Sequence, residues 1–406
     1  MSQPYEYSVI IPTLIAGDDL RDTLESLSAD TDAPSHEVIV VLNSQSRPEF
    51  ELKNINPNAR LVQTGSNLGF AGACNLGARD AVGKILVFIN DDMRVKSGFL
   101  NAFRDGMNRV GCKASGGRIL STDGKKFDFD GSSINLLGWG FQRNHGEPVT
   151  DNEFSSPSHI PFACGGNFAI ESSLFEKSGG FDETYFAFYE DVDLGWRLAL
   201  MGNEIAYIPD AVAFHKCGAT GNLIPPALKW FLQERNALIT IVKNYSDEIL
   251  NKILPIAIAL VAVRASILGG IDMDDIAQEK TWRDWIVGPP KESTESHGIW
   301  QGLMDGVKES IKSGQKKSRG ANLPHGWLPF ESKGAASLLA VEWCLDNWDI
   351  LSEKRRHVQK LRIKNDREIL PLFDDPMRPI LGHPREVAAM APLTDILNDL
   401  TGSERP

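Results

Sequence analysis

Short apolar runs alternate with amphipathic stretches along roughly the first ninety residues of the chain. Four runs predict strands: YSVIIPT (7–13), EVIVVLNS (37–44), ARLVQTG (59–65) and KILVFINDD (84–92). The second is almost unbroken in Val, Ile and Leu, as expected of a strand that is covered on both faces. Between them, leucines recur at helical spacing in DDLRDTLESL (18–27), and GFAGACNLGARDAV (69–82) predicts a helix of small residues. This alternation predicts an α/β fold with a mostly parallel sheet and flanking helices.

Polar residues follow the predicted strands at the points where the strands end. They are Pro12, Thr13, Asn43, Asn67, Asn90, Asp91 and Asp92. The carboxyl ends of parallel strands share one edge of the sheet, and open α/β sheets bind their ligands outside that edge. No GxGxxG follows the first strand, which disfavours a dinucleotide site. The sequence therefore predicts a binding crevice of another kind at this edge.

Two of these strand ends allow more than one interpretation. The glycines of NLGFAGACNLG (67–77) could bring backbone N–H groups to a phosphate, or they could serve close packing of helix on sheet. The acids of Asn90-Asp91-Asp92 are costly to crowd together unless a cation or hydrogen bonds compensate. Mg²⁺ or Mn²⁺ would do so while bridging a diphosphate, whereas a solvated turn is the simpler alternative.

The composition limits the function further. The chain has 406 residues, enough for two domains, and a formal charge of −12, which argues against nucleic-acid binding. An acidic protein that binds a nucleotide needs a metal or a local cluster of basic residues. The five cysteines show no CxxC spacing and the N-terminus does not resemble a signal peptide, so we expect a reducing, cytoplasmic location without disulfides or zinc.

Between residues 112 and 187 the periodicity weakens and predicts long loops rich in glycine and aromatic residues. Gly165 and Gly166 mark a close approach of the backbone to another group, or a plain turn. Further on, the strand-like AVAFH ends on His215. A histidine in this position is more often structural than a ligand.

FYEDVDLGWRL (188–198) places three carboxylates directly ahead of an apolar stretch. Apolar residues recur at helical spacing from Val192 onward, so Glu190, Asp191 and Asp193 belong to the first turn of a predicted helix. Carboxylates there interact favourably with the helix dipole and accept hydrogen bonds from free N–H groups. The same acids could instead act on a substrate, and this stretch alone favours the capping interpretation.

Taken together, these segments resemble the inverting, nucleotide-sugar-dependent glycosyltransferases of family 2, in the rhamnosyltransferase-like branch. The resemblance covers about residues 7 to 245 and rests on SVIIPT, NLGFAGACNLG, FINDD, the block GGFDETYFAFYEDVDLGWRL, His215 and QERN (233–236), in family order. Because of this resemblance, we favour a catalytic role for the acids at the start of the predicted helix at 190. This role is compatible with capping of the same helix.

The resemblance implies a GT-A fold, a nucleoside-diphosphate sugar donor and a divalent cofactor, Mn²⁺ or Mg²⁺. FINDD matches the metal-binding motif at a strand end, with Asp92 as the metal ligand and Asn90 in place of its first acid. His215 matches a histidine that joins the metal or the diphosphate. Asn43 stands where relatives commonly carry an Asp that reads the nucleotide, and Arg235 matches a basic position near the donor diphosphate.

The resemblance also implies a single displacement in which a carboxylate takes the proton of an acceptor hydroxyl. Asp191 matches this general base, with Glu190 beside it. Asp193 lies about 200° away around the helix and is expected to affect turnover less. The complete set of expected substrate- or nucleotide-binding residues is Pro12, Thr13, Asn43, Asn67, Asn90, Asp91, Gly165, Gly166, Glu190 and Arg235.

We expect a catalytic domain over residues 1–245 and a mainly helical C-terminal domain of unknown role over 246–406. In the latter, KRRHVQKLRIK (354–364) predicts a solvated helix face or a contact with an anionic membrane or polymer. The stretch 282–300 predicts a mobile loop, and Ile253 to Leu268 a buried or interfacial helix that is too short to span a membrane.

The expected partners are the sugar donor and a glycan or polyprenyl-linked glycan acceptor of cell-surface polysaccharide synthesis. Peripheral contact with the inner face of the membrane and self-association stay open. Two other functions are compatible with this type of sheet. One is a GT-A-like protein that binds a nucleotide or glycan without turnover. The other is a sugar nucleotidyltransferase, although PTLIAGDDL (12–20) lacks the glycine-rich, basic triphosphate loop expected after its first strand.

Overall fold

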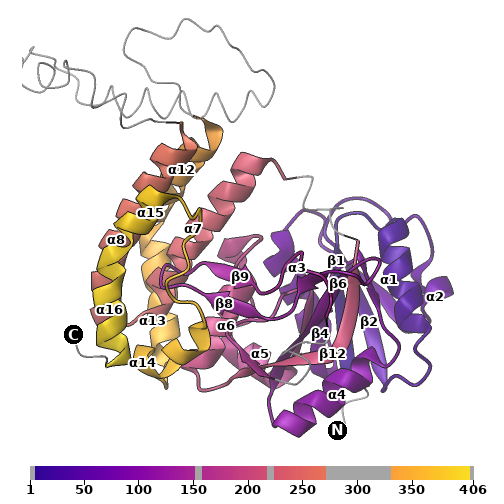
Figure 1. Ribbon diagram of the computed structural model, residues 1–406. Coiled ribbons are helices and arrows are strands. Elements are labelled where there is room, and N and C mark those ends of the chain that lie inside the picture. The colour runs from indigo at the N-terminus through magenta and orange to yellow at the C-terminus, as the bar shows by residue number, and fades with distance from the viewer. Residues whose placement is uncertain (1–4, 151–157, 217–223, 271–330, 403–406) are drawn as a thin grey trace, which may run out of the picture.

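The computed structural model describes residues 5–150, 158–216, 224–270 and 331–402. A mixed β-sheet with its helices forms one side of the molecule, and a layer of long C-terminal helices forms the other (Figure 1). The stretch 282–300, predicted to be a mobile loop, lies outside the described residues. The observed arrangement confirms the predicted fold class of an α/β sheet followed by a mainly helical C-terminal region.

The four strands predicted from apolar runs are all present and form one half of the sheet. They are β1 (Tyr5–Thr13), β2 (His36–Leu42), β3 (Ala59–Gln63) and β4 (Gly83–Ile89). They lie side by side in the order β4-β1-β2-β3, and every pair is parallel. Their carboxyl ends therefore share one edge, as the sequence predicts.

The prediction of long loops between residues 112 and 187 was wrong in part, because this region completes the sheet. β6 (Ala114–Ser121) and β11 (Asn167–Glu171) enter beside β4, and β11 runs antiparallel to both of its neighbours. The sequence of β6 contains small residues in place of a run of Val, Ile and Leu, so it does not predict a strand. These small residues are needed for packing, since a Cβ at Gly117 would lie 2.3 Å from the carbonyl oxygen of Ala211. The long strand β12 (Ile205–His215) then pairs with β6 in parallel.

Shorter strands extend this half of the sheet or form a hairpin beside it. They are β5 (Met93–Val95), β7 (Phe127–Phe129), β8 (Ser132–Ile134), β9 (Gly140–Gln142) and β10 (Ser158–Ile160). β5 and β10 pair with β12, β7 pairs with β6, and β8 pairs with β9. This part of the sheet therefore brings the end of β12 close to β7.

Of the helices of the N-terminal part, the sequence predicts the three that begin at Asp18, Gly69 and Glu190. The helices of this part are α1 (Asp18–Ser28), α2 (Leu52–Ile55), α3 (Gly69–Asp80), α4 (Phe99–Val110), α5 (Ser172–Ser178), a 3₁₀ turn η1 (Glu183–Tyr185) and α6 (Glu190–Leu200). The glycines of α3 serve close packing, since a Cβ at Gly77 would lie 2.6 Å from the side chain of Ile10 on β1. α6 begins at the acids predicted to form its first turn.

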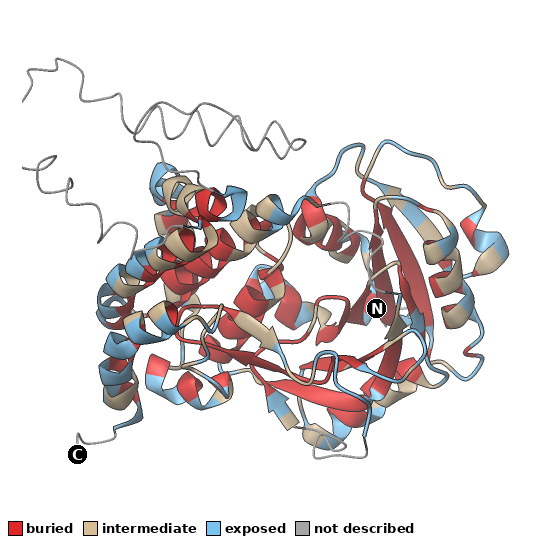
Figure 2. Ribbon diagram, turned by 45° about the horizontal axis from the view of Figure 1, so that its top comes forward, coloured by how far each residue is buried: buried red, intermediate tan, exposed pale blue. Residues whose placement is uncertain are grey.

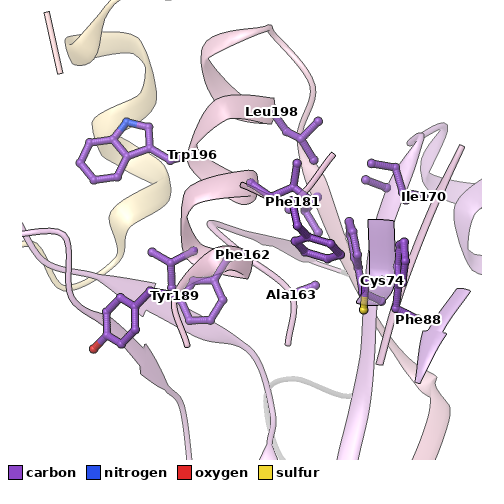
Figure 3. Packing of buried hydrophobic residues seen from close by; sticks show 14 of the residues in the cluster. Cys74, Phe88, Phe162, Ala163, Ile170, Phe181, Tyr189, Trp196 and Leu198 are labelled. Carbon is purple, nitrogen blue, oxygen red and sulfur yellow. The ribbon is translucent and has the colours of Figure 1, made fainter. Parts of the chain in front are cut away.

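The core is continuous from the sheet through α6 to the C-terminal helices (Figure 2). Phe88 of β4 meets Phe181 with ring centroids 5.2 Å apart. Trp196 of α6 is labelled in Figure 3. It packs edge-on against Tyr245 and Phe373, with ring centroids 4.8 Å apart in each pair. Because α6 is wedged between these aromatic groups, the acids at its start are held by a rigid support.

The C-terminal layer consists of long helices and short connecting turns. They are α7 (Pro226–Asn244), α8 (Asp247–Leu268), α12 (Ser332–Asp346), α13 (Trp348–Leu361), α14 (Asp366–Ile369), η3 (Leu370–Phe373), α15 (Pro384–Ala389) and α16 (Ala391–Thr401). α7 packs against α8, α12 and α13 as well as α6. The predicted boundary after residue 245 therefore falls between two helices of the same layer.

Two arginines of the basic run 354–364 do not form the predicted solvated face, whereas contact of the run with an anionic membrane or polymer stays a prediction. Arg355 donates hydrogen bonds to the carbonyls of Val242 and Tyr245, and Arg362 donates to that of Asn244. These carbonyls belong to the last turn of α7 and its C-cap, which have no partners within the helix. Cations also interact favourably with the negative end of a helix dipole, so these two arginines bind their own chain.

Within the described ranges one helix, α8, is long and apolar enough to cross a membrane by length and composition alone. The apolar window has a mean hydropathy of 1.7, and 44% of it is buried inside the protein. A core helix of a soluble protein passes the same test. The buried Arg264 near its end pairs with Glu234, which fits a helix that packs within the protein.

Candidate active site

The ends of β4, β7 and β12 bring three charged side chains into contact. His215, the last residue of β12, lies with its Nε2 3.1 Å from Oδ2 of Asp92. Its Nδ1 lies 2.6 Å from Oδ2 of Asp128, which is the middle residue of β7. Burial lowers the pKa of His215, but the hydrogen bonds to Asp128 and Asp92 outweigh it and raise the pKa to about 10. With no ion bound to its ring nitrogens, the imidazole of His215 is therefore a cation between the carboxylates of Asp92 and Asp128.

Asp91 completes the acidic turn that follows β4. Burial, together with the charges of Asp92 and Asp19, raises its pKa to about 7, although a hydrogen bond from Thr13 opposes the shift. Thr23 of α1 donates a hydrogen bond of 2.8 Å to the carbonyl of Asp91. The predicted residues at the ends of β1 and β4 thus do lie together, and the turn is held rather than freely solvated.

Asp191 lies at the start of α6 against the turn of two glycines. Its Oδ2 accepts a hydrogen bond of 3.1 Å from the backbone N–H of Gly165, and its Oδ1 accepts one of 2.8 Å from the N–H of Val192. Gly166 contacts Asn90, since its carbonyl accepts a hydrogen bond of 3.4 Å from the Asn90 N–H. The glycine turn therefore joins Asp191 to the acidic turn after β4.

Both glycines are needed for this close approach. A Cβ at Gly166 would lie 2.8 Å from the side chain of Asn90, and one at Gly165 would lie 2.9 Å from the ring of Phe70. Burial raises the pKa of Asp191 to about 6, against the opposing effect of its two backbone hydrogen bonds. A carboxylate with this pKa is ionised at neutral pH and is a stronger base than an ordinary Asp.

Glu190, the neighbour of Asp191, lies in a different environment. Its side chain is buried, and its Oε2 has no hydrogen-bond partner. Burial and the charge of Asp191 raise the pKa of Glu190 well above its usual range. Burial therefore disfavours the charged form of Glu190, whereas two backbone N–H groups stabilise the charged form of Asp191.

Sequence comparison identifies the family of this chain. The pattern of Glycosyl transferase family 2 matches residues 8–179. The N-acetylglucosaminyl-diphospho-decaprenol L-rhamnosyltransferase of Mycobacterium tuberculosis is 32% identical over 240 residues, which are 52% of this chain and 77% of that enzyme. The chain belongs to glycosyl transferase family 2. The O-antigen biosynthesis protein RfbC of Myxococcus xanthus is 29% identical over 242 residues, covering 55% of this glycosyltransferase and 18% of RfbC.

Solved structures with a similar arrangement of elements are more distant. GalNAc-T7 with UDP, GalNAc and Mn²⁺ aligns over 63% of this glycosyltransferase and 52% of its own chain, with a TM-score of 0.47 and 15% identity. TarS 1–349 of S. aureus in complex with UDP-GlcNAc aligns over 60% and 68%, with a TM-score of 0.43 and 17% identity.

The donor atoms of Asp92 and His215 fit a divalent metal. Two neighbouring ligands about 2.1 Å from an octahedral ion lie about 3 Å apart, close to the observed 3.1 Å between Asp92 Oδ2 and His215 Nε2. Asp128 holds the other ring nitrogen, as carboxylates commonly do behind metal-binding histidines. No group of three or more such ligands occurs within the described parts of the glycosyltransferase.

Asn43 and Asn67 have their side chains committed to the turn that opens α3. Asn43 Oδ1 accepts the N–H of Leu68 at 2.8 Å, and Asn67 Oδ1 accepts that of Gly69 at 2.9 Å. The next N–H group, of Phe70, binds the carbonyl of Phe186 at 2.7 Å. These N–H groups are therefore occupied by the protein, which supports the packing interpretation of the glycines over the phosphate one. Nucleotide reading by either asparagine stays a prediction.

Arg235 does not join the cluster of Asp92 and His215. Its Nη2 donates hydrogen bonds to the carbonyls of Thr184 and Tyr185, and its guanidinium lies 4.7 Å from the ring centroid of Trp343. The residue is buried. Contact with the donor diphosphate stays a prediction, and the observed contacts indicate a role in holding the segment before α6.

Sequence analysis missed two residues of this region. Asp128 lies in KFDFDG (126–131), where the alternation of Phe and Asp is typical of a strand with two acids on one face. That alternation was a usable signal. Asn236 in QERN had no such signal, because its partners are the backbone carbonyls of residues 185–188, about fifty positions away.

Proposed function

We propose that this family 2 glycosyltransferase transfers a sugar from a nucleoside diphosphate to a hydroxyl of a glycan or lipid-linked glycan, with inversion and with a divalent metal. The observation on which this rests is the glycine turn of Gly165 and Gly166. It joins an ionised carboxylate, Asp191, to the turn that bears Asp92. A base and a diphosphate site at one edge of the sheet are the two parts that this reaction needs.

The leaving diphosphate carries negative charge that must be neutralised. Mn²⁺ or Mg²⁺ bound to Asp92 and His215 would supply this neutralisation without any transfer of protons. Asp128 would orient the imidazole of His215 so that Nε2 faces the ion. Asp91, whose pKa is raised to about 7, would add little charge repulsion against the donor.

The acceptor hydroxyl must lose its proton as its oxygen attacks the sugar. We assign this proton to Asp191, which is ionised at neutral pH and held in place by the N–H groups of Gly165 and Val192. A base on the face of the sugar opposite the leaving group requires only one displacement, so the anomeric configuration inverts. No covalent intermediate with the enzyme is needed.

The relatives suggest the class of acceptor. The M. tuberculosis relative is named as an L-rhamnosyltransferase of N-acetylglucosaminyl-diphospho-decaprenol, and RfbC as an O-antigen biosynthesis protein. By analogy, we propose rhamnosyl or hexosyl transfer to a polyprenyl-linked glycan in cell-surface polysaccharide synthesis. The protein would then work in the cytoplasm, at or near the inner face of the membrane. We assign donor chemistry to residues 1–245 and acceptor engagement or assembly to 246–406.

Incubation with UDP-, GDP- and dTDP-sugars, Mn²⁺ and a polyprenyl-diphosphate-linked GlcNAc acceptor tests this proposal. We expect release of a nucleoside diphosphate that depends on acceptor and metal, and a product whose anomeric configuration, measured by NMR, is opposite to that of the donor. Release of pyrophosphate from a nucleoside triphosphate would indicate a nucleotidyltransferase instead. A product with retained configuration would contradict the single displacement.

A further inference from the structure

The segment directly before the catalytic helix has an unusual backbone. Phe186, Phe188 and Tyr189 have φ angles of 63°, 67° and 69°, positive values that are unfavourable for large side chains. The described residues include five such non-glycine positions, and three of them fall within these four residues. Strain of this kind persists only where surrounding groups enforce it, and it tends to occur at functional sites.

Asn236 of α7 supplies much of this enforcement. Its side chain is fully buried, and its Nδ2 lies 3.1, 2.9 and 2.6 Å from the carbonyl oxygens of Tyr185, Ala187 and Phe188. Its Oδ1 accepts a hydrogen bond of 2.9 Å from Nε of Arg235. One amide group thus gathers three carbonyls that a relaxed chain would point in different directions.

Arg235 and α3 hold the same segment from two further sides. Arg235 Nη2 donates to the carbonyls of Thr184 and Tyr185 at 3.0 and 2.9 Å. The carbonyl of Phe186 accepts the N–H of Phe70 at the start of α3. A Cβ at Gly69 would lie 2.3 Å from that carbonyl oxygen, so this approach requires glycine.

We infer that Asn236, supported by Arg235, is a positioning residue for catalysis, an inference that rests on the proposed role of Asp191 as the base. The carbonyl contacts hold residues 185–188, two of which have positive φ, and Tyr189, also at positive φ, is the N-cap of α6. The direction in which α6 leaves this segment determines where Asp191 meets Gly165. Asn236 touches neither Asp92 nor His215, so donor and metal binding do not depend on it.

A double-mutant cycle between Asn236→Ala and Phe188→Gly tests this inference. Asn236→Ala should lower kcat roughly 10²-fold, the usual effect of misplacing a catalytic group by about 1 Å. The Kd of a nucleoside diphosphate with Mn²⁺ should change less than about twofold, because the donor side is untouched. Glycine adopts positive φ freely, so in the Phe188→Gly background the same substitution should cost about tenfold or less.

Thr240→Val is the matched control, from the next turn of α7. The Thr240 hydroxyl is buried and lies 2.8 Å from the phenol of Tyr185, but it does not contact the carbonyls of residues 185–188. This variant loses two buried hydrogen bonds, one to the phenol of Tyr185 and one of 2.8 Å to the backbone carbonyl of Asn236. It should lower the melting temperature and leave kcat per folded molecule within about twofold, since the side chain of Asn236 keeps its own contacts. Equal kcat losses in Thr240→Val and Asn236→Ala would reduce Asn236 to ordinary packing.

Two further outcomes separate this inference from the proposed function. If Asn236→Ala costs the same with and without Phe188→Gly, strain in the segment is not what Asn236 controls, and the inference fails. If Asp191→Asn retains full transfer activity, the proposed base is wrong regardless of the cycle. Strong loss in Asp191→Asn together with an unaffected Asn236→Ala would overturn only the inference.

Discussion

At the scale of single residues, burial separates the roles of two neighbouring acids. Glu190 is buried with an unpartnered oxygen, whereas Asp191 accepts two backbone hydrogen bonds at the glycine turn. Burial raises the pKa of both, but only Asp191 keeps donors for its charged form. Their adjacency in the sequence does not reveal this difference, because it arises from Gly165, 26 positions away.

The pH dependence of catalysis should follow Asp191. Its pKa is raised to about 6, so the ionised base is present above pH 6, and kcat/KM should fall as the pH drops through that value. Burial raises the pKa of Glu190 well above its usual range and disfavours its charged form, so Glu190→Gln should leave the midpoint of the acid limb within about half a pH unit. A shift to lower pH of more than about one unit in Glu190→Gln would mean that Glu190 is ionised beside the base.

Metal and donor binding should be coupled through Asp92 and His215. Asp92→Ala removes one of two proposed protein ligands, and Mn²⁺ titration with a bound nucleoside diphosphate should show at least about tenfold weaker metal binding. Asp128→Asn changes the partner of His215 Nδ1. It should weaken Mn²⁺ binding about 10- to 100-fold, as is usual for residues that hydrogen-bond to a metal-binding histidine. Unchanged metal affinity in Asp92→Ala would contradict the proposal that Asp92 and His215 bind the metal.

At the scale of elements, a buried ion network locks α6 to α7. Asp193 pairs with Arg197 of its own helix at 2.8 Å and with Lys243 of α7 at 2.9 Å. Lys243 in turn pairs with Asp182 at 2.6 Å. Asp193 does point away from the glycine turn, but it is a structural residue. Asp193→Asn is therefore unsuitable as a silent control for Asp191→Asn.

We expect Asp193→Asn to lower the free energy of unfolding by about 3 kcal/mol, because it leaves buried cations incompletely paired. Lys354→Ala is the comparison: Lys354 also pairs with Asp182, but from a partly exposed position, and should cost less than about 1 kcal/mol. Despite burial, Lys243 and Arg197 hold the pKa of Asp193 below its usual range. The difference from wild type in urea unfolding should therefore persist at neutral pH and shrink below about pH 4. Equal losses for both variants would contradict the network.

The sequence predicted the elements whose signals are local. The four parallel strands, α1, α3 and the acid-headed α6 follow from apolar spacing over ten residues or so, and the edge at which Thr13 and Asp92 meet follows from the parallel order. Contacts between distant segments had no such signal. β11 reaches the centre of the sheet, and Asn236 reaches residues 185–188, through tertiary contacts.

At the scale of the whole molecule, the C-terminal helices support the catalytic part. α13 supplies donors to the last carbonyls of α7, from Arg355, Gln359 and Arg362. α7 in turn holds the segment before α6 through Asn236. The helical layer is thus connected to the proposed base by direct contacts, although its sequence shows no catalytic motif.

Two double variants of α13 and its C-terminal end separate this structural role from membrane contact. Arg355→Gln with Arg362→Gln removes donors to α7, and should lower the free energy of unfolding by about 2 kcal/mol or more, since buried carbonyls lose their partners. Arg356→Gln with Lys360→Gln removes the same charge from exposed positions and should change it by less than about 0.5 kcal/mol. The fraction of protein that co-sediments with anionic vesicles should be the same for the two double variants. Loss of vesicle binding only in the exposed pair would restore the membrane interpretation of this run.

The central claim, that Asp191 is the base of an inverting glycosyl transfer, is tested most directly by Asp191→Asn. Asn keeps the size of the side chain and one acceptor oxygen, so the free energy of unfolding should fall only about 1 to 2 kcal/mol, the effect of one lost hydrogen bond. The rate of sugar transfer per folded molecule should fall about 10²- to 10⁴-fold, while calorimetric affinity for the nucleoside diphosphate with Mn²⁺ stays within about twofold. Transfer at the wild-type rate, or loss of donor affinity in parallel with the rate, would contradict this account.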